Sequence, residues 1–232
     1  MQVPSGQTFS ELDIQLMRHL HSVGFIKWSE SPFTLKSGIK SHVYVFGRED
    51  ITDNPRVLAH VGRKIAAVVH ELADHRQPCV IGIPTAGTAL AVGTSVYNES
   101  ARHYVGQRGI ACRIMREMKK THGAHTTWVV GKPEHEKQQY FVLDNVVTDG
   151  GSKFEAAKKL KEDGYQLEDL HFLTFVARQQ GAMAKLVAHG LKTTAIYNIL
   201  DIAHAFKVLR LWPEEAERRV EDEIREHQLG LA

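Results

Sequence analysis

Apolar runs of strand length alternate with longer amphipathic stretches along most of the chain. Residues 79–83 (CVIGI), 140–145 (YFVLDN), 170–176 (LHFLTFV) and 193–199 (TTAIYNI) are predicted to be strands of a buried sheet. Their alternation with helical stretches is typical of an α/β domain with a central, mostly parallel sheet flanked by helices. The carboxyl ends of parallel strands lie at one edge of such a sheet, where ligands bind.

Several stretches with helical spacing separate these strands. Ser10 and nearby acids can cap a helix that ends near Val23. Pro55 begins a second helix that reaches about Asp74, because apolar residues recur there at helical spacing. Further helices are predicted after residue 84 and in two ranges, 151–164 and 213–227.

Two segments are expected to be neither buried strands nor helices. Residues 33–46 (FTLKSGIKSHVYVF) alternate around a Ser-Gly turn and predict a hairpin. The second segment is 116–126 (REMKKTHGAHT), after the apolar segment 109–115. It is polar, contains a glycine and lacks an apolar period. This pattern predicts a long mobile loop.

The composition limits the class of protein. A chain of 232 residues with 43% hydrophobic and 24% charged residues can form one domain around a sizeable core. Lys plus Arg (29) nearly balance Asp plus Glu (27), so the charge does not indicate a nucleic-acid or polybasic membrane surface. A binding site for an anion must therefore be local.

The chain shows neither a leader pattern nor an apolar run of the length that spans a membrane, so we expect a soluble, cytoplasmic protein. Cys79 and Cys112 stand far apart in apolar contexts and are expected to be buried thiols. The 14 histidines are scattered, without an H-E-x-x-H or C-x-x-C spacing, and do not predict a metal site made by protein side chains.

The most informative stretch is residues 140–157 (YFVLDNVVTDGGSKFEAA), where a buried strand passes through a glycine-rich turn into a helix. Free backbone N–H groups and the positive end of the helix suit a phosphate. Asp144, near the carboxyl end of the strand, would accept hydrogen bonds from sugar hydroxyls. The stretch therefore favours a phosphorylated sugar. The phosphate cup would be formed by Thr148, Asp149, Gly150, Gly151 and Ser152.

An ordinary strand-to-helix turn that uses glycine for its conformation explains the same stretch equally well from composition alone. The stretch contains neither a G-x-x-x-x-G-K-[ST] nor a G-x-G-x-x-G motif.

Residues 140–152 resemble the phosphoribosyl-pyrophosphate motif of the type I phosphoribosyltransferases, in which an apolar strand leads to two acids and then V-x-T-x-G-x-S. More of the chain resembles the orotate phosphoribosyltransferases. The similar segments are 33–55 (F-x-L-K-S-G-x-x-S-P-x-Y in the family), 82–87 (GIPTAG, the pyrophosphate loop), 116–123 (REMKKTHG, the mobile loop) and 176–190 (the D-R-x-x-G segment). Their order along the chain is more specific than any single segment.

This resemblance implies a type I phosphoribosyltransferase-like fold in a single domain of residues 1–232. A small N-terminal hood would take residues 1–50, the core residues 55–200, and C-terminal helices residues 201–232. The implied reaction moves the 5-phosphoribosyl group of phosphoribosyl pyrophosphate onto orotate in de novo pyrimidine synthesis. Magnesium would be bound mainly through substrate oxygens and water. Family members work as homodimers in which the mobile loop reaches the partner's site.

The resemblance also assigns roles to individual residues. Lys120, His122 and Arg116 would meet the pyrophosphate as the loop closes. Arg178 would pair with the orotate carboxylate, since a planar guanidinium matches a planar anion. Lys36 would reach orotate or pyrophosphate, and Phe33 packs nearby. The turn that contains Thr85, Ala86 and Gly87 would face the pyrophosphate. Taken singly, each has an ordinary structural alternative, such as a solvated loop, a core aromatic or a surface ion pair.

Several positions depart from the family pattern. Asn145 replaces the second acid, so one carboxylate at the ribose is missing, although the Asn145 amide can still bind the sugar through a hydroxyl. Glu117 stands where a lysine is frequent, a loss of positive charge for which Lys119 could compensate. His42 and Ala177 replace a proline and an acid. A carboxylate beside a phosphate is repulsive, and Asp149 is therefore expected to face solvent.

These departures leave two other functions open. One is a catalytically weakened protein that binds phosphoribosyl pyrophosphate or nucleotides as a regulator. The other is a phosphoribosyltransferase that acts on a different base.

Overall fold

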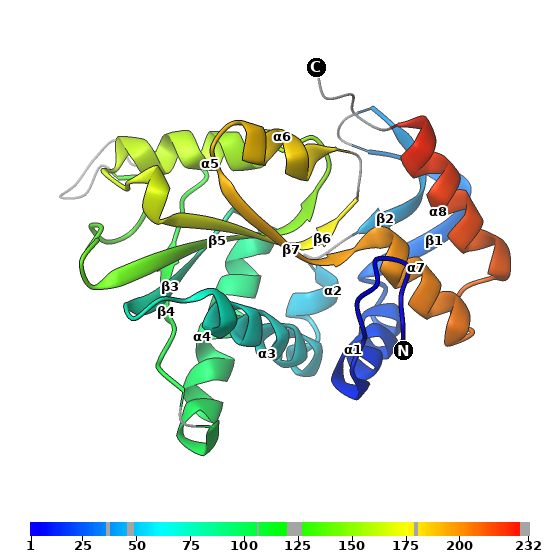
Figure 1. Cartoon of the computed structure of the whole chain (residues 1–232), viewed down its shortest axis with the longest axis horizontal. Coiled ribbons are helices and arrows are strands. Elements are labelled where there is room, and N and C mark those ends of the chain that lie inside the picture. Colours follow the sequence, from blue (N-terminus) through cyan, green and yellow to red (C-terminus); the bar gives the residue numbers. More distant parts are fainter. Residues whose placement is uncertain (36–37, 46–48, 106, 120–126, 179–180, 228–232) are drawn as a thin grey trace.

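The computed structural model describes residues 1–35, 38–45, 49–105, 107–119, 127–178 and 181–227. A five-stranded sheet with the strand order β4-β3-β5-β6-β7 lies at the centre of this part of the chain (Figure 1). All of its strand pairs are parallel, which confirms the predicted α/β class. The strands are β3 (Gln77–Gly82), β4 (Ala111–Ile114), β5 (Gln138–Val147), β6 (Leu170–Ala177) and β7 (Lys192–Asn198).

Helices cover both faces of the sheet (Figure 1). The helices of the described residues are α1 (Glu11–Ser22), α2 (Glu49–Thr52), α3 (Pro55–Leu72), α4 (Ala86–Val105), α5 (Gly151–Glu162), α6 (Ala182–Ala188), α7 (Ile199–Val208) and α8 (Glu214–Glu226). Successive side chains of β5 point to opposite faces of the sheet, as in any β-strand. Phe141 packs in the cluster that includes Val61 of α3, whereas Tyr140 packs in the cluster that includes Leu160 of α5. Burial on both faces explains why the strands are continuously apolar.

The N-terminal hairpin is a second, antiparallel sheet of β1 (Ile26–Thr34) and β2 (Lys40–Val45). Phe33 lies opposite Ser41 and Trp28 opposite Val43, and the register shifts between these two pairs. The predicted hairpin is confirmed. However, β1 begins at Ile26 and not at residue 33.

The predicted helix boundaries agree closely with the structure. Ser10 caps α1 in a capping box: its hydroxyl accepts from the amide of Asp13, whose carboxylate accepts from the amide of Ser10. Asp13 also accepts hydrogen bonds from Lys64 and Tyr197. Burial alone would raise the pKa of Asp13, but the hydrogen bonds from Lys64, Tyr197 and Ser10 together lower it below its ordinary value.

Two predictions require correction. The strand predicted for residues 140–145 continues to Val147, so Asp144 and Asn145 lie within β5 and not at its end. Both thiols are free, but only Cys79 is buried, whereas Cys112 is half-buried. Burial raises the pKa of Cys79 to about 12 and that of Cys112 to about 11, so both thiols are protonated at neutral pH.

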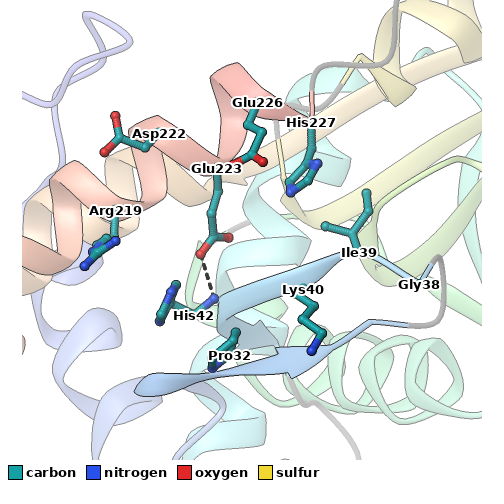
Figure 2. A pocket seen from close by; sticks show the side chains of 10 residues that line it. All are labelled: Pro32, Gly38, Ile39, Lys40, His42, Arg219, Asp222, Glu223, Glu226 and His227. Atoms are coloured by element: carbon teal, nitrogen blue, oxygen red, sulfur yellow. Dashed lines mark hydrogen bonds between the residues drawn. The ribbon is translucent and has the colours of Figure 1, made fainter.

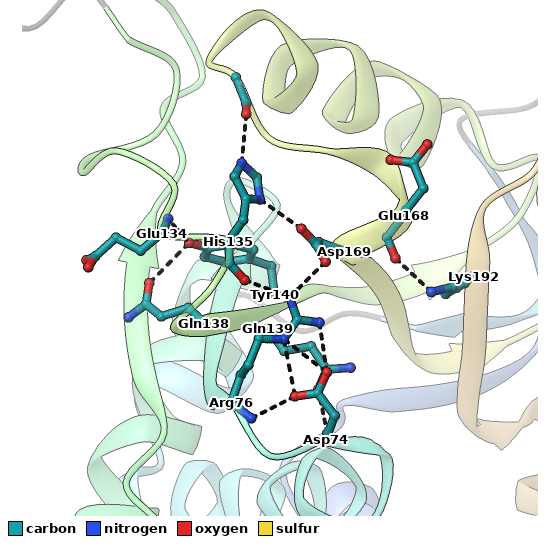
Figure 3. Close-up of polar contacts among 11 residues, drawn as sticks. Asp74, Arg76, Glu134, His135, Gln138, Gln139, Tyr140, Glu168, Asp169 and Lys192 are labelled. Atoms are coloured by element: carbon teal, nitrogen blue, oxygen red, sulfur yellow. Dashed lines mark hydrogen bonds and ion pairs between the residues drawn. The ribbon is translucent and has the colours of Figure 1, made fainter.

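A polar network ties together the loops at the amino-terminal edge of the sheet (Figure 3). The Arg76 guanidinium pairs with Asp74 and with Asp169, each at 2.8 Å, and His135 Nδ1 lies 2.8 Å from the other oxygen of Asp169. Burial would raise the pKa of Asp169, but the hydrogen bonds from Arg76 and His135 lower it overall. This network lies beside the first residues of β3, β5 and β6, opposite the edge where parallel sheets bind ligands.

No helix within the described ranges is long and apolar enough to cross a lipid bilayer.

Candidate active site

The strand order changes direction at β3, which has β4 on one side and β5 on the other. A crevice for ligands forms at such a point in an open parallel sheet, outside the carboxyl ends of the strands. Gly82 of β3 lies opposite Leu143 of β5, and the Ile83 amide donates to the Leu143 carbonyl at 2.8 Å. The turn at 84–87 therefore begins beside Asp144, the next residue of β5.

Close backbone contacts hold this turn against β5. A Cβ atom added to Gly87 would lie 2.3 Å from the Leu143 carbonyl oxygen, and one added to Gly82 would lie 2.2 Å from the Gly87 carbonyl oxygen. Only glycine fits at either position without moving the backbone. Ala86 is buried as the first residue of α4, and a cis peptide joins Pro84 to Thr85.

Thr85 is exposed at the tip of this turn, and its hydroxyl donates to Glu117 Oε1 at 2.6 Å. The acid that replaces the family's frequent lysine therefore lies on the predicted pyrophosphate loop. Lys119 Nζ lies instead 3.7 Å from Glu162 of α5 and over the ring of Trp128. Whether Lys119 compensates for the positive charge that Glu117 removes from the loop stays a prediction.

The predicted phosphate cup connects β5 to α5. Gly150 adopts a left-handed conformation with φ 84° and precedes the helix, whose N-terminus has no side-chain cap among the described residues. Asp149 is exposed, as predicted. Its Oδ1 atom accepts a hydrogen bond from the Gly151 amide at 3.0 Å, so one of the amides expected to be free has an internal partner. Thr148 is half-buried between β5 and this turn.

Asp144 is paired with a lysine that the sequence analysis did not identify. Its Oδ2 atom accepts from Lys153 Nζ at 2.5 Å and from Ser152 Oγ at 3.0 Å, and its Oδ1 atom accepts from the Asn145 amide at 2.9 Å. Asp144 is 8% exposed and Lys153 1% exposed. Burial lowers the pKa of Lys153, and the Asp144 carboxylate opposes that shift.

This pair changes the charge of the predicted ribose subsite. A carboxylate offers about four acceptor positions, and three on Asp144 are already used. One position remains for a sugar hydroxyl. Because Asn145 is neutral and Lys153 balances Asp144, these three side chains carry no net negative charge.

A sequence signal for Lys153 did exist. Lys153, Ala156, Ala157 and Leu160 are the buried residues of α5 and lie at helical spacing, so the lysine occupies a core-facing position. A lysine at such a position requires a partner.

Arg178 follows β6 and lies next to the phosphate cup, because its amide donates to the Val147 carbonyl at 3.3 Å. Its side chain is 4% exposed and donates to the Val43 carbonyl at 2.9 Å and to Ser41 Oγ at 2.6 Å. The hairpin thus packs over the carboxyl edge of the sheet through Arg178. Phe33 reaches the same region through its pairing with Ser41, and its ring packs against Tyr44 at 5.6 Å.

Arg116 lies close to the end of β4. Its amide and its Nη1 atom donate to the carbonyls of Trp128 and Thr127, both at 2.8 Å. The predicted residues Lys36, Lys120 and His122 lie outside the described residues.

The turns after β3 and β5 and the first residue after β6 therefore meet at one edge of the sheet, beneath the hairpin. Within the described ranges, no group of three or more His, Cys, Asp or Glu side chains could hold a metal ion.

Several curated relatives of the chain are orotate phosphoribosyltransferases. An orotate phosphoribosyltransferase from Thermosynechococcus vestitus is 32% identical over 170 residues, which cover 73% of this chain and 83% of the relative. One from a Nostoc species is 27% identical over 184 residues, which cover 79% of this chain and 83% of the relative. No protein-family model matches the chain.

Solved structures share the fold at lower identity. The crystal structure of an orotate phosphoribosyltransferase from Francisella tularensis matches with a TM-score of 0.68 at 16% identity and covers 91% of this chain and 98% of that one. An orotate phosphoribosyltransferase from Mycobacterium tuberculosis, solved with 5-phospho-α-D-ribosyl 1-diphosphate, matches with a TM-score of 0.57 at 19% identity and covers 82% of this chain and 97% of that one.

Proposed function

The chain belongs to the orotate phosphoribosyltransferase family, and from that premise we propose that it transfers the 5-phosphoribosyl group of phosphoribosyl pyrophosphate to orotate. The products are orotidine 5′-monophosphate and pyrophosphate, as in de novo pyrimidine synthesis. The observation that carries the proposal is the meeting of the turn at 84–87, the turn after β5 and Arg178 at one sheet edge. These are the elements that the reaction needs for a diphosphate, a sugar phosphate and a base.

The 5-phosphate binds at the N-terminus of α5, where left-handed Gly150 precedes helical N–H groups. Asp144 accepts a hydrogen bond from a ribose hydroxyl through its remaining acceptor position. The pyrophosphate lies against residues 84–87, which the contact of Gly87 with β5 holds beside the sugar.

The base binds beneath the hairpin, where Arg178 pairs with the orotate carboxylate. The resemblance assigns Phe33 and Lys36 to the same subsite. Transfer passes through a sugar with oxocarbenium character, so the protein must hold the base in line and stabilise the leaving pyrophosphate. Lys120, His122 and Arg116 supply positive charge and hydrogen-bond donors to that leaving group.

Magnesium fits this site as a substrate-bound ion, because Asp144 is already paired with Lys153 and Asn145 offers no charge. When bound to pyrophosphate oxygens and water, the ion neutralises charge on the leaving group. We further propose a homodimer in which the loop that carries Lys120 reaches the partner's site. A cytoplasmic location agrees with two free thiols in the described chain.

A regulator that binds phosphoribosyl pyrophosphate without catalysis is the second candidate. The pairing of Asp144 with Lys153, together with Asn145, favours it, because these features reduce the negative charge available to a developing cation.

The deciding experiment mixes the purified protein with phosphoribosyl pyrophosphate, magnesium and orotate, and follows orotate absorbance. The proposal predicts loss of orotate with stoichiometric pyrophosphate release. Replacing Arg178 by Met should raise the orotate KM at least about tenfold, since a charge-assisted pair is lost. The matched control is Arg218→Met, which removes an equal charge from an exposed position of α8. No turnover by the wild-type protein, with retained binding of phosphoribosyl pyrophosphate, would favour the regulator.

A further inference from the structure

The carboxylate of Glu223 on α8 is bound by donors from two other segments. Its Oε2 atom accepts from Ser41 Oγ at 2.6 Å. Its Oε1 atom accepts from the His42 amide, also at 2.6 Å (Figure 2). Arg178 Nη2 lies 3.7 Å from Oε2. A hydroxyl, a backbone amide and a guanidinium around one buried carboxylate form a carboxylate-binding site.

The same arginine has an unused donor. Arg178 Nε is buried and has no hydrogen-bond partner among the described residues, while both Nη atoms donate to the hairpin. A buried donor without a partner is costly, and a carboxylate that reached Nε and Nη2 together would satisfy it. Glu223 approaches only Nη2, and at a longer distance than a direct hydrogen bond.

Open space lies beside Glu223. A cavity of about 630 Å³ separates the hairpin from α8, and Lys40 and Arg219 line it together with Glu223 (Figure 2). Asp222 and Glu226 line it as well. Arg219, one helical turn before Glu223 on α8, can pair with the carboxylate once it leaves Arg178. The other end of α8 is fixed, because Ala216 and Val220 are buried in the core.

We propose that Glu223 is an internal competitor for the base: it occupies the carboxylate-binding half of the subsite, and the orotate carboxylate displaces it toward the cavity. The proposal rests on the proposed function, which makes Arg178 the partner of that carboxylate. Glu223 then sets the affinity for carboxylate-bearing ligands, and α8 moves when such a ligand binds.

The experiment compares Glu223→Gln with the wild-type protein. The amide keeps the shape of the side chain, and its one oxygen can still accept from the His42 amide, but its NH2 group replaces the oxygen that accepts from Ser41 Oγ, and the attraction to Arg178 is lost. Orotidine 5′-monophosphate should bind about fivefold more tightly to the variant, because a charge-assisted contact no longer has to be broken. Uridine 5′-monophosphate, which differs only by lacking the carboxylate, should bind equally to both proteins. Glu226→Gln is the matched control, because it removes the same charge from an exposed residue lining the same cavity.

Amide hydrogen exchange on the wild-type protein gives a second measurement that needs no variant. Orotidine 5′-monophosphate should speed exchange in the last turn of α8, and uridine 5′-monophosphate should not. Equal or weaker binding of orotidine 5′-monophosphate by Glu223→Gln, or slower exchange in α8, would overturn the proposal and make Glu223 a support for Arg178. Failure of the wild-type protein to bind either nucleotide would instead refute the proposed function, and this inference with it.

Discussion

The pairing of Lys153 with Asp144 gives the sharpest prediction for stability. Lys153→Met removes the ammonium group, keeps a long side chain and leaves the Asp144 carboxylate with only the Ser152 hydroxyl and the Asn145 amide as donors. The side chains of the pair are 2% and 11% exposed, so their charges are largely removed from water.

Breaking a buried ion pair by removing one partner costs about 3–5 kcal/mol. Asp144 keeps two donors and borders the predicted crevice, so we expect the lower end, about 3 kcal/mol of unfolding free energy. In a chain of this size, that loss lowers the Tm by about 6–12 °C.

The assay is a double-mutant cycle measured by urea unfolding. The single variants are Lys153→Met and Asp144→Asn, and the double variant combines them. If each charge stabilises the other, the double variant will lose less unfolding free energy than the two single variants lose together. We expect this difference to be about 2 kcal/mol. Lys158→Met, at an exposed position of the same helix, should change stability by less than about 0.5 kcal/mol. Additive losses in the cycle would refute the claim that Lys153 compensates Asp144.

Three further predictions follow from other contacts. The pKa of Asp13 is lowered in the folded protein, so its stabilising effect is complete above its ordinary pKa and is lost as the pH falls through the lower folded value. Asp13→Asn should therefore cost about 2–3 kcal/mol at neutral pH, and less below about pH 4; an equal cost at both pH values by urea unfolding would contradict this. Gly87→Ala should abolish turnover or sharply lower the Tm, because its Cβ would lie 2.3 Å from the Leu143 carbonyl oxygen; unchanged kinetics and Tm would show that the turn is not fixed there. Asp149→Asn should tighten phosphoribosyl pyrophosphate binding about threefold by calorimetry, because a negative charge leaves the phosphate cup; weaker binding would mean that the Asp149 bond to the Gly151 amide organises the turn.

The parts of the fold that follow from local patterns could be predicted from the sequence. Four of the five strands of the sheet, β3, β5, β6 and β7, are predicted by their apolar runs, whereas β4, whose residues are half-buried or exposed, was not predicted as a strand. Helix α1 is predicted because Ser10 and Asp13 form a capping box within one helical turn. The start of β1 was missed because the polar run at 29–32, which ends in a proline, hides the strand pattern. Helix α6 has seven residues, too few for an apolar period to stand out.

In the candidate site, too, features with a local sequence pattern could be predicted, and contacts between distant segments could not. The turns after β3 and β5 carry their own signals, namely glycines that follow apolar strands. No sequence signal identifies Glu223 as the acid beside Arg178. Glu223 lies 182 residues from Ser41 and occupies a helix whose other acids are mostly exposed. Only the packing of α8 against the hairpin brings these residues together. The pairing of Lys153 with Asp144 was accessible in principle from its position on the buried face of α5.

The central claim is that one sheet edge binds both substrates. The most direct measurement is a crystal structure with phosphoribosyl pyrophosphate and orotate bound. The account predicts the 5-phosphate on the amides of residues 148–152, the pyrophosphate against residues 84–87 and the orotate carboxylate on Arg178. A sugar phosphate bound elsewhere, such as at Arg76 on the opposite edge, would contradict it.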